Sequence, residues 1–288
     1  MADRSRVPGG NDQGLFFVDD TCIDCDLCRE IAPTVFVAAA GQSVVGCQPS
    51  GSGEQLRASM ALVACPTGSI GTRAPIDLAA AKTAFPYPIE DGVYACGYAS
   101  RDSYGAKSYL IVRPEGNVLV DSPRFSRPLV RRIESLGGVR TMFMTHRDDV
   151  ADHEHFASHF ACERVMHSGD APGIRVEHLI EGDDPVEIDP GLTIIPTPGH
   201  TRGHAVLLHQ NRFLFSGDHL AWSEPRGHLI AFRTHNWYSW PETIRSMERL
   251  TQYRFEWVLP GHGRPVHFPP DRMSTELARC VEWMKQVA

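Results

Sequence analysis

The sequence predicts an α+β fold, in which a small cysteine-rich domain precedes a larger domain of sheets covered by helices. Three cysteines lie close together near the N-terminus, in the stretch CIDCDLC. Beyond residue 88, strand-like runs bounded by Gly, Pro and Asp are mixed with segments whose apolar residues recur at helical spacing. These two observations indicate two different folding units in one chain.

Composition and charge narrow the class of protein. The chain of 288 residues has the length of one or two domains, and its 42% of hydrophobic residues is enough for a core. A net charge of −7 gives no sign of a nucleic-acid or membrane partner. The N-terminus lacks a secretory signal, and no apolar run approaches the roughly 18 residues that a membrane span needs. We therefore expect a cytoplasmic protein, in which cysteines favour metal or redox chemistry over disulfides.

The first cysteines have the spacing of iron–sulfur ligands. A tight loop can turn Cys22, Cys25 and Cys28 toward one centre, and Cys65, which proline follows, supplies a remote fourth thiolate. With the flanking REIAPTVF and CPTGSI, residues 16–71 resemble the bacterial ferredoxins that carry one [4Fe-4S] cluster. In that family an aspartate in place of the second cysteine accompanies a three-iron cluster, so Cys25 implies four irons. The alternative is a structural zinc site, but zinc ribbons usually pair two C-x2-C knuckles, and a single extended triplet occurs here.

A boundary follows the cysteine-rich part. The segment APIDLAAAKTAFPYP, residues 74–88, contains three prolines and is typical of a linker or a packing arm. We place a ferredoxin-like domain at residues 1–73 and a second domain at residues 89–288. The other cysteines are expected to be small buried residues rather than ligands: Cys47, Cys96, Cys162 and Cys280.

The second domain is expected to mix strands and helices. The runs SYLIVR, NVLVDSP and VRTMFMTH predict strands, and residues 128–136 predict a helix that ends at a Gly-Gly pair. Further strands are expected at residues 192–196, 205–209, 212–215 and 255–259. Helical spacing of apolar residues marks residues 240–253 and 274–288.

Metal-binding residue types stand at the ends of four of these strands. They are His146 after VRTMFMT, His200 in PTPGHTRGH, Asp218 in FLFSGDH and His262 in WVLPGHG. Each lies beside turn residues, so all four side chains can project from one edge of a pair of sheets. Imidazoles and carboxylates that converge in this way suit zinc, iron or manganese.

This ordered set, over about residues 88–268, resembles the metallo-β-lactamase superfamily. The resemblance implies an αββα sandwich that holds one or two divalent metals at the edge between its sheets. It also implies that Asp218 bridges two metals and that His204 supports a ligand rather than binding a metal itself.

The stretch THRDDVADH, residues 145–153, departs from the family motif H-x-H-x-D-H, and two registers fit it. In the first register, Asp152-His153 is the Asp-His pair after a longer loop and holds a second metal with His262. In the second register, Asp148 replaces the second histidine, although a helix N-cap is an alternative role for it. A helix that begins near Asp149 would place Asp149, Asp152 and His153 on one face.

The expected metal ligands are therefore His146, His200, Asp218, His262 and one or both of Asp152 and His153, with Asp148 as a further candidate. The carboxylates of Asp152 and Asp218 are the expected catalytic groups.

Such a site predicts a hydrolase. A metal held by imidazoles and carboxylates lowers the pKa of bound water, and the resulting hydroxide can attack an ester, thioester, lactone or amide. The iron–sulfur domain supports an alternative, a redox enzyme in which the cluster feeds electrons to a mono- or di-iron site. Two further possibilities are a hydrolase that the cluster regulates or stabilises, and an electron carrier without catalysis. The expected partners are a small-molecule substrate and, for the redox alternative, a redox partner protein.

Overall fold

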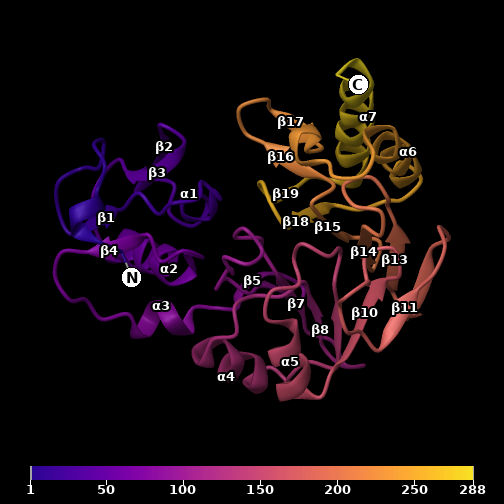
Figure 1. Ribbon diagram of the computed structural model, residues 1–288, viewed down its shortest axis with the longest axis horizontal. Coiled ribbons are helices and arrows are strands. Elements are labelled where there is room, and N and C mark those ends of the chain that lie inside the picture. Colours follow the sequence, from indigo (N-terminus) through magenta and orange to yellow (C-terminus); the bar gives the residue numbers. More distant parts are fainter. Residues whose placement is uncertain (1, 288) are drawn as a thin grey trace. The chain divides into compact units, whose positions relative to one another are not determined.

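The computed structural model describes residues 2–287, and the chain divides into two compact units (Figure 1). The first comprises the chain up to Asn117, together with Ser122–Val139 and Ala151–Phe156. The second comprises Val118–Asp121, Arg140–Val150 and the chain from Ala157 onward. Among the described residues, no helix is both long enough and apolar enough to cross a bilayer.

The N-terminal part of the first unit consists of two small antiparallel sheets and two helices. Its elements are η1 (Arg4–Arg6), β1 (Phe16–Val18), α1 (Leu27–Ile31), β2 (Phe36–Ala39), β3 (Gln42–Val45), α2 (Ser52–Ala64) and β4 (Ile70–Thr72). β1 pairs with β4, and β2 pairs with β3. Between the clustered cysteines, Asp24 and Asp26 adopt left-handed backbone conformations with φ of 57° and 66°, which lets the loop turn tightly. Cys22, Cys28 and Cys65 pack against the buried core of this part.

The rest of the first unit contains three antiparallel strands and short helices. Its elements are α3 (Ala79–Thr83), β5 (Tyr87–Glu90), β6 (Val93–Ala95), β7 (Tyr109–Ile111), α4 (Arg127–Ser135) and the start of α5 (His153–Phe160). β6 pairs with β5 on one side and β7 on the other. The helix expected at residues 128–136 is confirmed as α4, whose first turn carries a proline. The expected linker contains α3 and the beginning of β5.

The second unit contains two sheets and two long helices. One sheet has the parallel strands β8 (Val118–Val120), β9 (Thr141–Phe143), β10 (Glu163–His167) and β11 (His178–Ile180). The other has β12 (Val186–Asp189), β13 (Leu192–Pro196), β14 (Ala205–His209), β15 (Phe213–Gly217), β18 (Trp257–Pro260) and β19 (Val266–His267), in that order. The remaining elements are the hairpin of β16 (Ala221–Ser223) and β17 (His228–Ile230), η2 (Arg233–His235), α6 (Trp240–Leu250) and α7 (Pro270–Gln286).

Helices α6 and α7 cover one face of the six-stranded sheet. Met247 and Leu250 of α6 and Leu277 of α7 share one buried core with Val206 and Val258 of the sheet. Every residue of β14 and β15 is buried, as expected for strands covered on both faces. The strands expected at residues 192–196 and 205–209 are therefore confirmed with the same bounds.

The strand ends place the candidate ligands. β15 and β18 run parallel with Gly217 opposite Pro260, so Asp218 and His262 follow neighbouring strands at the same edge. The backbone N–H of Ala205, at the start of β14, donates to the carbonyl of Thr145 over 2.9 Å. That bond brings the two sheets together directly beside His146.

One expected helix starts later than proposed. The hypothetical helix beginning near Asp149 is wrong, because α5 begins at His153 and Ala151 has a positive φ of 26°. A residue with positive φ interrupts a right-handed helix. Asp149 consequently lies in the loop after β9 and not on a helix face.

Candidate metal centre and iron–sulfur site

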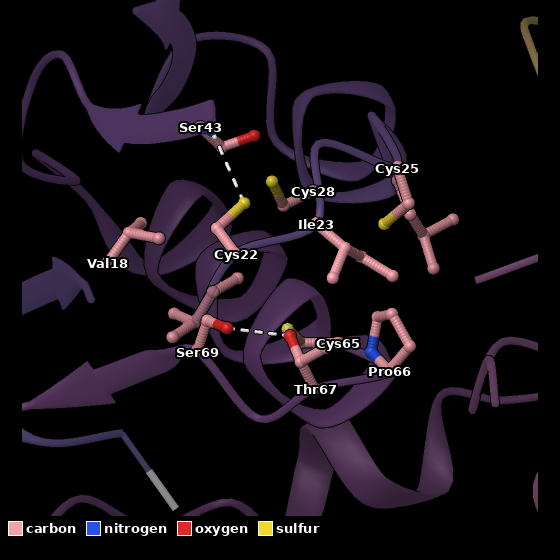
Figure 2. A pocket seen from close by; sticks show the side chains of 12 residues that line it. Val18, Cys22, Ile23, Cys25, Cys28, Ser43, Cys65, Pro66, Thr67 and Ser69 are labelled. Carbon is pink, nitrogen blue, oxygen red and sulfur yellow. Dashed lines mark hydrogen bonds between the residues drawn. The ribbon is translucent and has the colours of Figure 1, made fainter. Parts of the chain in front are cut away.

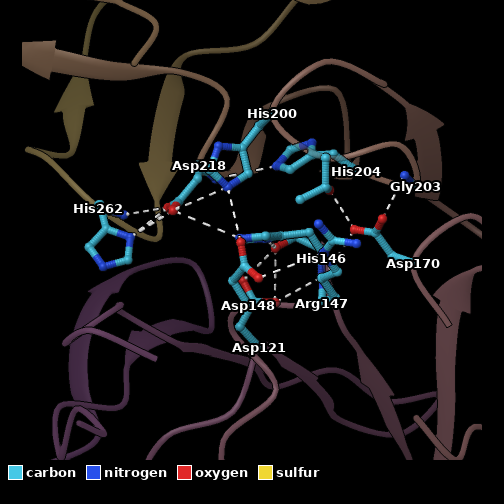
Figure 3. Close-up of polar contacts among 12 residues, drawn as sticks. Asp121, His146, Arg147, Asp148, Asp170, His200, Gly203, His204, Asp218 and His262 are labelled. Carbon is cyan, nitrogen blue, oxygen red and sulfur yellow. Dashed lines mark hydrogen bonds and ion pairs between the residues drawn. The ribbon is translucent and has the colours of Figure 1, made fainter. Parts of the chain in front are cut away.

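Four donor atoms from three loops of the second unit converge on one point (Figure 3). The Nε2 atom of His146 lies 4.0 Å from Oδ2 of Asp148 and 3.8 Å from Oδ2 of Asp218. The Nε2 atom of His200 lies 3.6 Å and 3.8 Å from the same two oxygens. Ligands about 2.1 Å from a tetrahedral ion are roughly 3.4 Å apart, so a small inward movement of these side chains would complete a metal site.

The two histidines are buried and present bare nitrogens to this point. His146 is fully buried and His200 is 3% exposed. Within residues 2–287, neither Nε2 of His146 nor either ring nitrogen of His200 has a hydrogen-bond partner. Burial lowers the pKa of His146 to about 4, so its imidazole is neutral at pH 7. Unpartnered imidazole nitrogens beside carboxylates have the chemistry of a metal site, because an unsatisfied buried polar atom is otherwise costly.

Asp121 and Thr145 orient the His146 ring. The Thr145 hydroxyl lies 2.9 Å from Nδ1 of His146 and 3.0 Å from Oδ1 of Asp121. When Nε2 faces a metal, Nδ1 carries the proton and donates to Thr145, which donates in turn to Asp121. Burial raises the pKa of Asp121 to about 7, against the lowering effect of the hydrogen bonds from Thr145.

His204 lies beside the candidate centre and forms a hydrogen bond with the backbone of Asp218. Its Nδ1 lies 2.9 Å from the hydroxyl of Thr197, and its Nε2 accepts from the backbone N–H of Asp218 over 3.3 Å. Burial holds the pKa of His204 well below its usual range. This geometry agrees with the supporting role that the family resemblance implied.

A further part of the site contains Asp149 and His262, whose shared neighbour is Asp218. Nδ1 of His262 lies 2.7 Å from Oδ1 of Asp218, and the His262 backbone N–H donates to that oxygen over 3.1 Å. Asp149 belongs with His146 and Asp218 to a second group of closely spaced donors. A Cβ atom on Gly261 would lie 2.7 Å from Oδ2 of Asp149 and 2.9 Å from Oδ1 of Asp218, so only glycine lets the chain pass here.

The carboxylates of the centre are held in their ionised form. Burial alone would raise the pKa of Asp218, but the imidazoles of His262, His146 and His200 hold it far below its usual range. His200 is the main cause that lowers the pKa of Asp148, with further contributions from His146 and Arg147. The two carboxylates would balance the charge of one divalent cation at this point.

Asp170 connects the two loops that carry the histidines (Figure 3). Its carboxylate accepts from the Thr201 hydroxyl, from the backbone N–H of Gly203 over 2.8 Å and from the backbone N–H of Arg147 over 3.2 Å. Asp170 is 1% exposed, so these bonds form out of water. The carboxylate therefore fixes the loop after β13 relative to the loop after β9.

The sequence-based candidates divide into two groups. The structure brings His146, Asp148, His200, Asp218 and His262 together in the second unit. Asp152 and His153 belong to the first unit, where Oδ2 of Asp152 accepts from the backbone N–H of Phe125 over 2.7 Å and His153 is buried. Their predicted role as ligands, and that of Asp152 in catalysis, stay predictions.

Asp121, Thr145 and Asp170 were not predicted from the sequence. One signal pointed to them, because Asp121 directly follows β8 and Asp170 lies shortly after β10, as His146 follows β9. The same rule of polar residues at strand ends would have included them. Nothing in the sequence, however, indicates which of these residues bind a metal and which bind the ligands.

The four predicted cluster ligands line one cavity in the first unit (Figure 2). Cys22, Cys25, Cys28 and Cys65 surround it together with apolar side chains such as Val18. Within residues 2–287 no cysteine is in a disulfide. Burial raises the pKa of the Cys25 thiol to about 11 and that of Cys28 to about 12. Thiolates in such a place need a strong positive charge beside them, which the iron of a [4Fe-4S] cluster supplies, so the residues fit that cofactor.

The other cysteines are outside this cavity. Cys96, Cys162 and Cys280 are buried thiols as expected, with 0%, 6% and 0% of their surface exposed. The expectation that Cys47 is also buried is wrong, since its side chain is exposed. It lies two residues after the end of β3, next to Gly46, which is also exposed.

The family of the chain follows from this fold and this site. The description "Metallo-beta-lactamase superfamily" matches residues 93–281, and "4Fe-4S single cluster domain of Ferredoxin I" matches residues 18–72. The protein thus consists of a ferredoxin-type segment followed by a segment of the metallohydrolase type. It belongs to the metallo-β-lactamase superfamily and carries an N-terminal single-cluster ferredoxin domain.

Two relatives are similar in sequence. The hydroxyacylglutathione hydrolase of Rhodospirillum rubrum is 33% identical over 120 residues, which cover 39% of this chain and 46% of that enzyme. The match thus spans about half the length of that relative. A probable metallo-hydrolase of Methanocaldococcus jannaschii is 27% identical over 198 residues, which cover 56% of this chain and 88% of that protein.

Solved structures confirm the α+β fold class. The metallo-β-lactamase from Hirschia baltica matches with a TM-score of 0.53 and 17% identity, over 67% of this chain and 95% of that one. The DIM-1 metallo-β-lactamase exposed to ceftazidime matches with a TM-score of 0.54 and 16% identity, over 70% of this chain and 96% of that one. At these identities the likeness concerns the fold alone.

Proposed function

We propose that the protein is a metal-dependent hydrolase of esters, thioesters, lactones or amides whose N-terminal domain carries a [4Fe-4S] cluster. The observation that carries this proposal is that Nε2 of His146 and Nε2 of His200 each lie 3.6–4.0 Å from a carboxylate oxygen of Asp148 and from one of Asp218. The hydroxyacylglutathione hydrolase relative supports thioesters as the first substrates to test. We also propose the domain division at residues 1–73, 74–88 and 89–288, inside which both family matches lie.

The chain's own residues would prepare the centre for hydrolysis. A divalent metal bound there would supply Lewis acidity toward water and toward a substrate carbonyl. His146 and His200 would hold it through Nε2, and Asp148 and Asp218 through carboxylate oxygens. Thr145 and Asp121 keep the proton of His146 on Nδ1, so Nε2 stays directed at the centre. In its predicted catalytic role, Asp218 would hold the metal as an ionised carboxylate, because a group whose pKa lies so far below the usual range is a weak base.

An aromatic segment next to His200 supports a substrate site. The Trp237 ring centroid lies 6.4 Å from that of His200, and the Trp237 backbone N–H donates to the His200 carbonyl over 2.8 Å. Trp237 is 59% exposed, so an apolar surface stands open beside the proposed metal. A hollow of about 580 Å³, lined in part by Arg202, Tyr238 and Glu242, adds room for a polar part of the substrate.

Metal analysis and substrate assays test the proposal together. Anaerobically purified protein should contain four irons in the cluster and one or two further divalent ions. Chromogenic thioester, ester and lactone panels should show turnover that His200→Ala abolishes and His178→Ala, at an exposed strand residue, preserves. Purified protein with no second metal and no turnover on any panel would overturn the proposal.

The carboxylate content of the centre favours a second candidate function. Asp148 stands where the family motif has histidine, and Asp149 adds another carboxylate, so the donor set suits iron or manganese better than zinc. With iron bound, the protein would be an oxidoreductase that receives electrons from the cluster and from a redox partner protein. Activity that requires the reduced cluster and disappears in Cys22→Ala supports this candidate. Hydrolysis that persists in Cys22→Ala contradicts it.

A further inference from the structure

We propose that residues 100–107, which lie in the part of the chain that matches the metallo-β-lactamase superfamily, belong to the iron–sulfur site, where Lys107 raises the reduction potential of the cluster. These residues and the cysteine cavity are in the same compact unit. The inference concerns the cluster and is independent of the reaction at the metal centre.

Gly105 brings this segment against a cluster ligand. A Cβ atom on Gly105 would lie 2.8 Å from Cβ of Cys25, 3.1 Å from its Sγ and 3.1 Å from Cγ of Pro66. Gly105 also has a φ of +86°, which residues with side chains rarely adopt. The backbone N–H of Gly105 donates to the Ser100 carbonyl over 2.8 Å, so the turn is held in this position. The segment therefore covers the Cys25 side of the cavity.

Lys107 places a positive charge close to the same ligand. Its side chain is only 9% exposed, and its Nζ lies 3.4 Å from Oε2 of Glu30. Glu30 is in α1, the helix that also carries Cys28. Lys107 also follows Gly105, which lies against Cys25, by only two residues. The buried charge is thus held beside two of the segments that carry the cluster ligands.

The sign of the effect follows from electrostatics. One-electron reduction makes the cluster more negative by one charge. A nearby cation therefore stabilises the reduced cluster more than the oxidised cluster. The Lys107 side chain is largely buried. Its charge is therefore screened only weakly by the solvent and by dissolved salt. Lys107 should therefore raise the reduction potential, and the Glu30 carboxylate should lower it.

Two variants with opposite expected signs test the inference in the full chain with its cluster loaded. Lys107→Met should shift the midpoint potential downward, and Glu30→Gln should shift it upward. Lys107→Arg, which keeps the charge, should stay near the wild-type value. Lys82→Met, at an exposed lysine in α3, is the matched control and should leave the potential unchanged. Voltammetry gives the potential, and iron and sulfide content confirms that the cluster is present.

The results separate potential tuning from a purely structural ion pair. Shifts of Lys107→Met and Glu30→Gln in the same direction, or a Lys82→Met shift as large as that of Lys107→Met, would overturn the proposal. If Lys107→Met does not retain its cluster, Glu30→Gln decides alone, with an upward shift in support and any other result against.

The contact of the segment with Cys25 has its own control. Gly105→Ala should reduce the cluster content of the purified protein. Gly41→Ala, at a glycine with a similar φ of +77° and no atom within 4 Å of an added Cβ, should retain it. Equal cluster content in the two variants would contradict the close approach of residues 100–107 to the cluster.

Discussion

When the H-x-H-x-D-H motif of the superfamily is aligned on His146, Asp148 stands in the place of the second histidine. It offers a carboxylate 3.6 Å from Nε2 of His200, where the motif has an imidazole. Carboxylates favour harder cations, and imidazole favours zinc. Asp148→His should therefore raise the zinc-to-iron ratio of protein purified from medium containing both metals, measured by elemental analysis. Asp184→His, at an exposed position, should leave the ratio unchanged. An unchanged ratio in Asp148→His would remove Asp148 from the ligand set.

His219 makes stability depend on pH. The ring is fully buried, and within residues 2–287 neither ring nitrogen has a hydrogen-bond partner. Burial lowers its pKa to about 3. Below its ordinary pKa of about 6.5 the unfolded chain binds a proton there and the folded protein does not, so the free energy of unfolding falls as the pH falls from about 6.5 toward 3.

His219→Phe should weaken this dependence. Between pH 6.5 and pH 5.5 the metal-free variant should lose about 1 kcal/mol less of its unfolding free energy than the metal-free wild type. All five tryptophans are in the second unit, so urea unfolding followed by their fluorescence reports on it. His178→Phe, at an exposed histidine, is expected to retain the wild-type dependence. Identical pH profiles for His219→Phe and the wild type would mean that the buried ring does not titrate as argued.

The residues of the centre could be predicted where a turn motif accompanies them. His200, Asp218 and His262 all follow strands and lie beside glycine, and all three lie at the centre. Asp121 and Asp170 have no such motif, and their role comes from hydrogen bonds to residues that lie 23 to 33 positions away from them in sequence. Partners at that separation depend on the tertiary fold and leave no local pattern.

At the scale of elements, the loops after β9 and β13 must keep a fixed relative position for His146 and His200 to meet. The hydrogen bonds of Asp170 hold the two loops in that position. Asp170 accepts hydrogen bonds from Arg147 on one loop and from Thr201 and Gly203 on the other. Asp170→Asn replaces one acceptor oxygen with an amide that cannot accept. Metal affinity should fall about 10- to 100-fold while the far-UV circular dichroism stays unchanged. Titration of metal-free protein measures the affinity, with the exposed Asp184→Asn as the control. Wild-type affinity in Asp170→Asn would show that the loops are held by other contacts.

Regular elements were predictable where apolar periodicity is strong. The strands β13 and β14 have the expected bounds, and α6 begins at the expected residue, where Ser239 caps it by accepting from the backbone N–H of Glu242. The loop after β9 was not predictable. Its sequence permits a helix from Asp149, but the backbone turns at Ala151 and α5 begins only at His153. Tertiary contacts of the loop decide between these conformations, and local propensity does not.

The whole molecule combines two sites whose ligands come from separate stretches of the chain. The four thiols all lie within residues 22–65, and the donor atoms of the metal centre all lie within residues 146–262. The family matches divide in the same way, at residues 18–72 and 93–281. This organisation was predictable because each site has its own ordered motif. The substrate was not, because the proposed substrate site lies at Trp237 and its neighbours, which carry no motif.

Because the two sites share no ligand, they should lose their metals independently. A chelator such as EDTA at neutral pH should remove the divalent ion from the metal centre while the visible absorbance of the [4Fe-4S] cluster persists. Conversely, Cys22→Ala should lose the cluster and retain the divalent ion, whereas Cys47→Ala, at an exposed cysteine outside the cavity, should retain both. Binding of the ion to the folded state alone also stabilises that state by mass action, so EDTA should lower the unfolding midpoint seen by tryptophan fluorescence. Bleaching of the cluster at the rate of divalent-ion loss, or loss of the divalent ion from Cys22→Ala, would show that the two sites depend on each other.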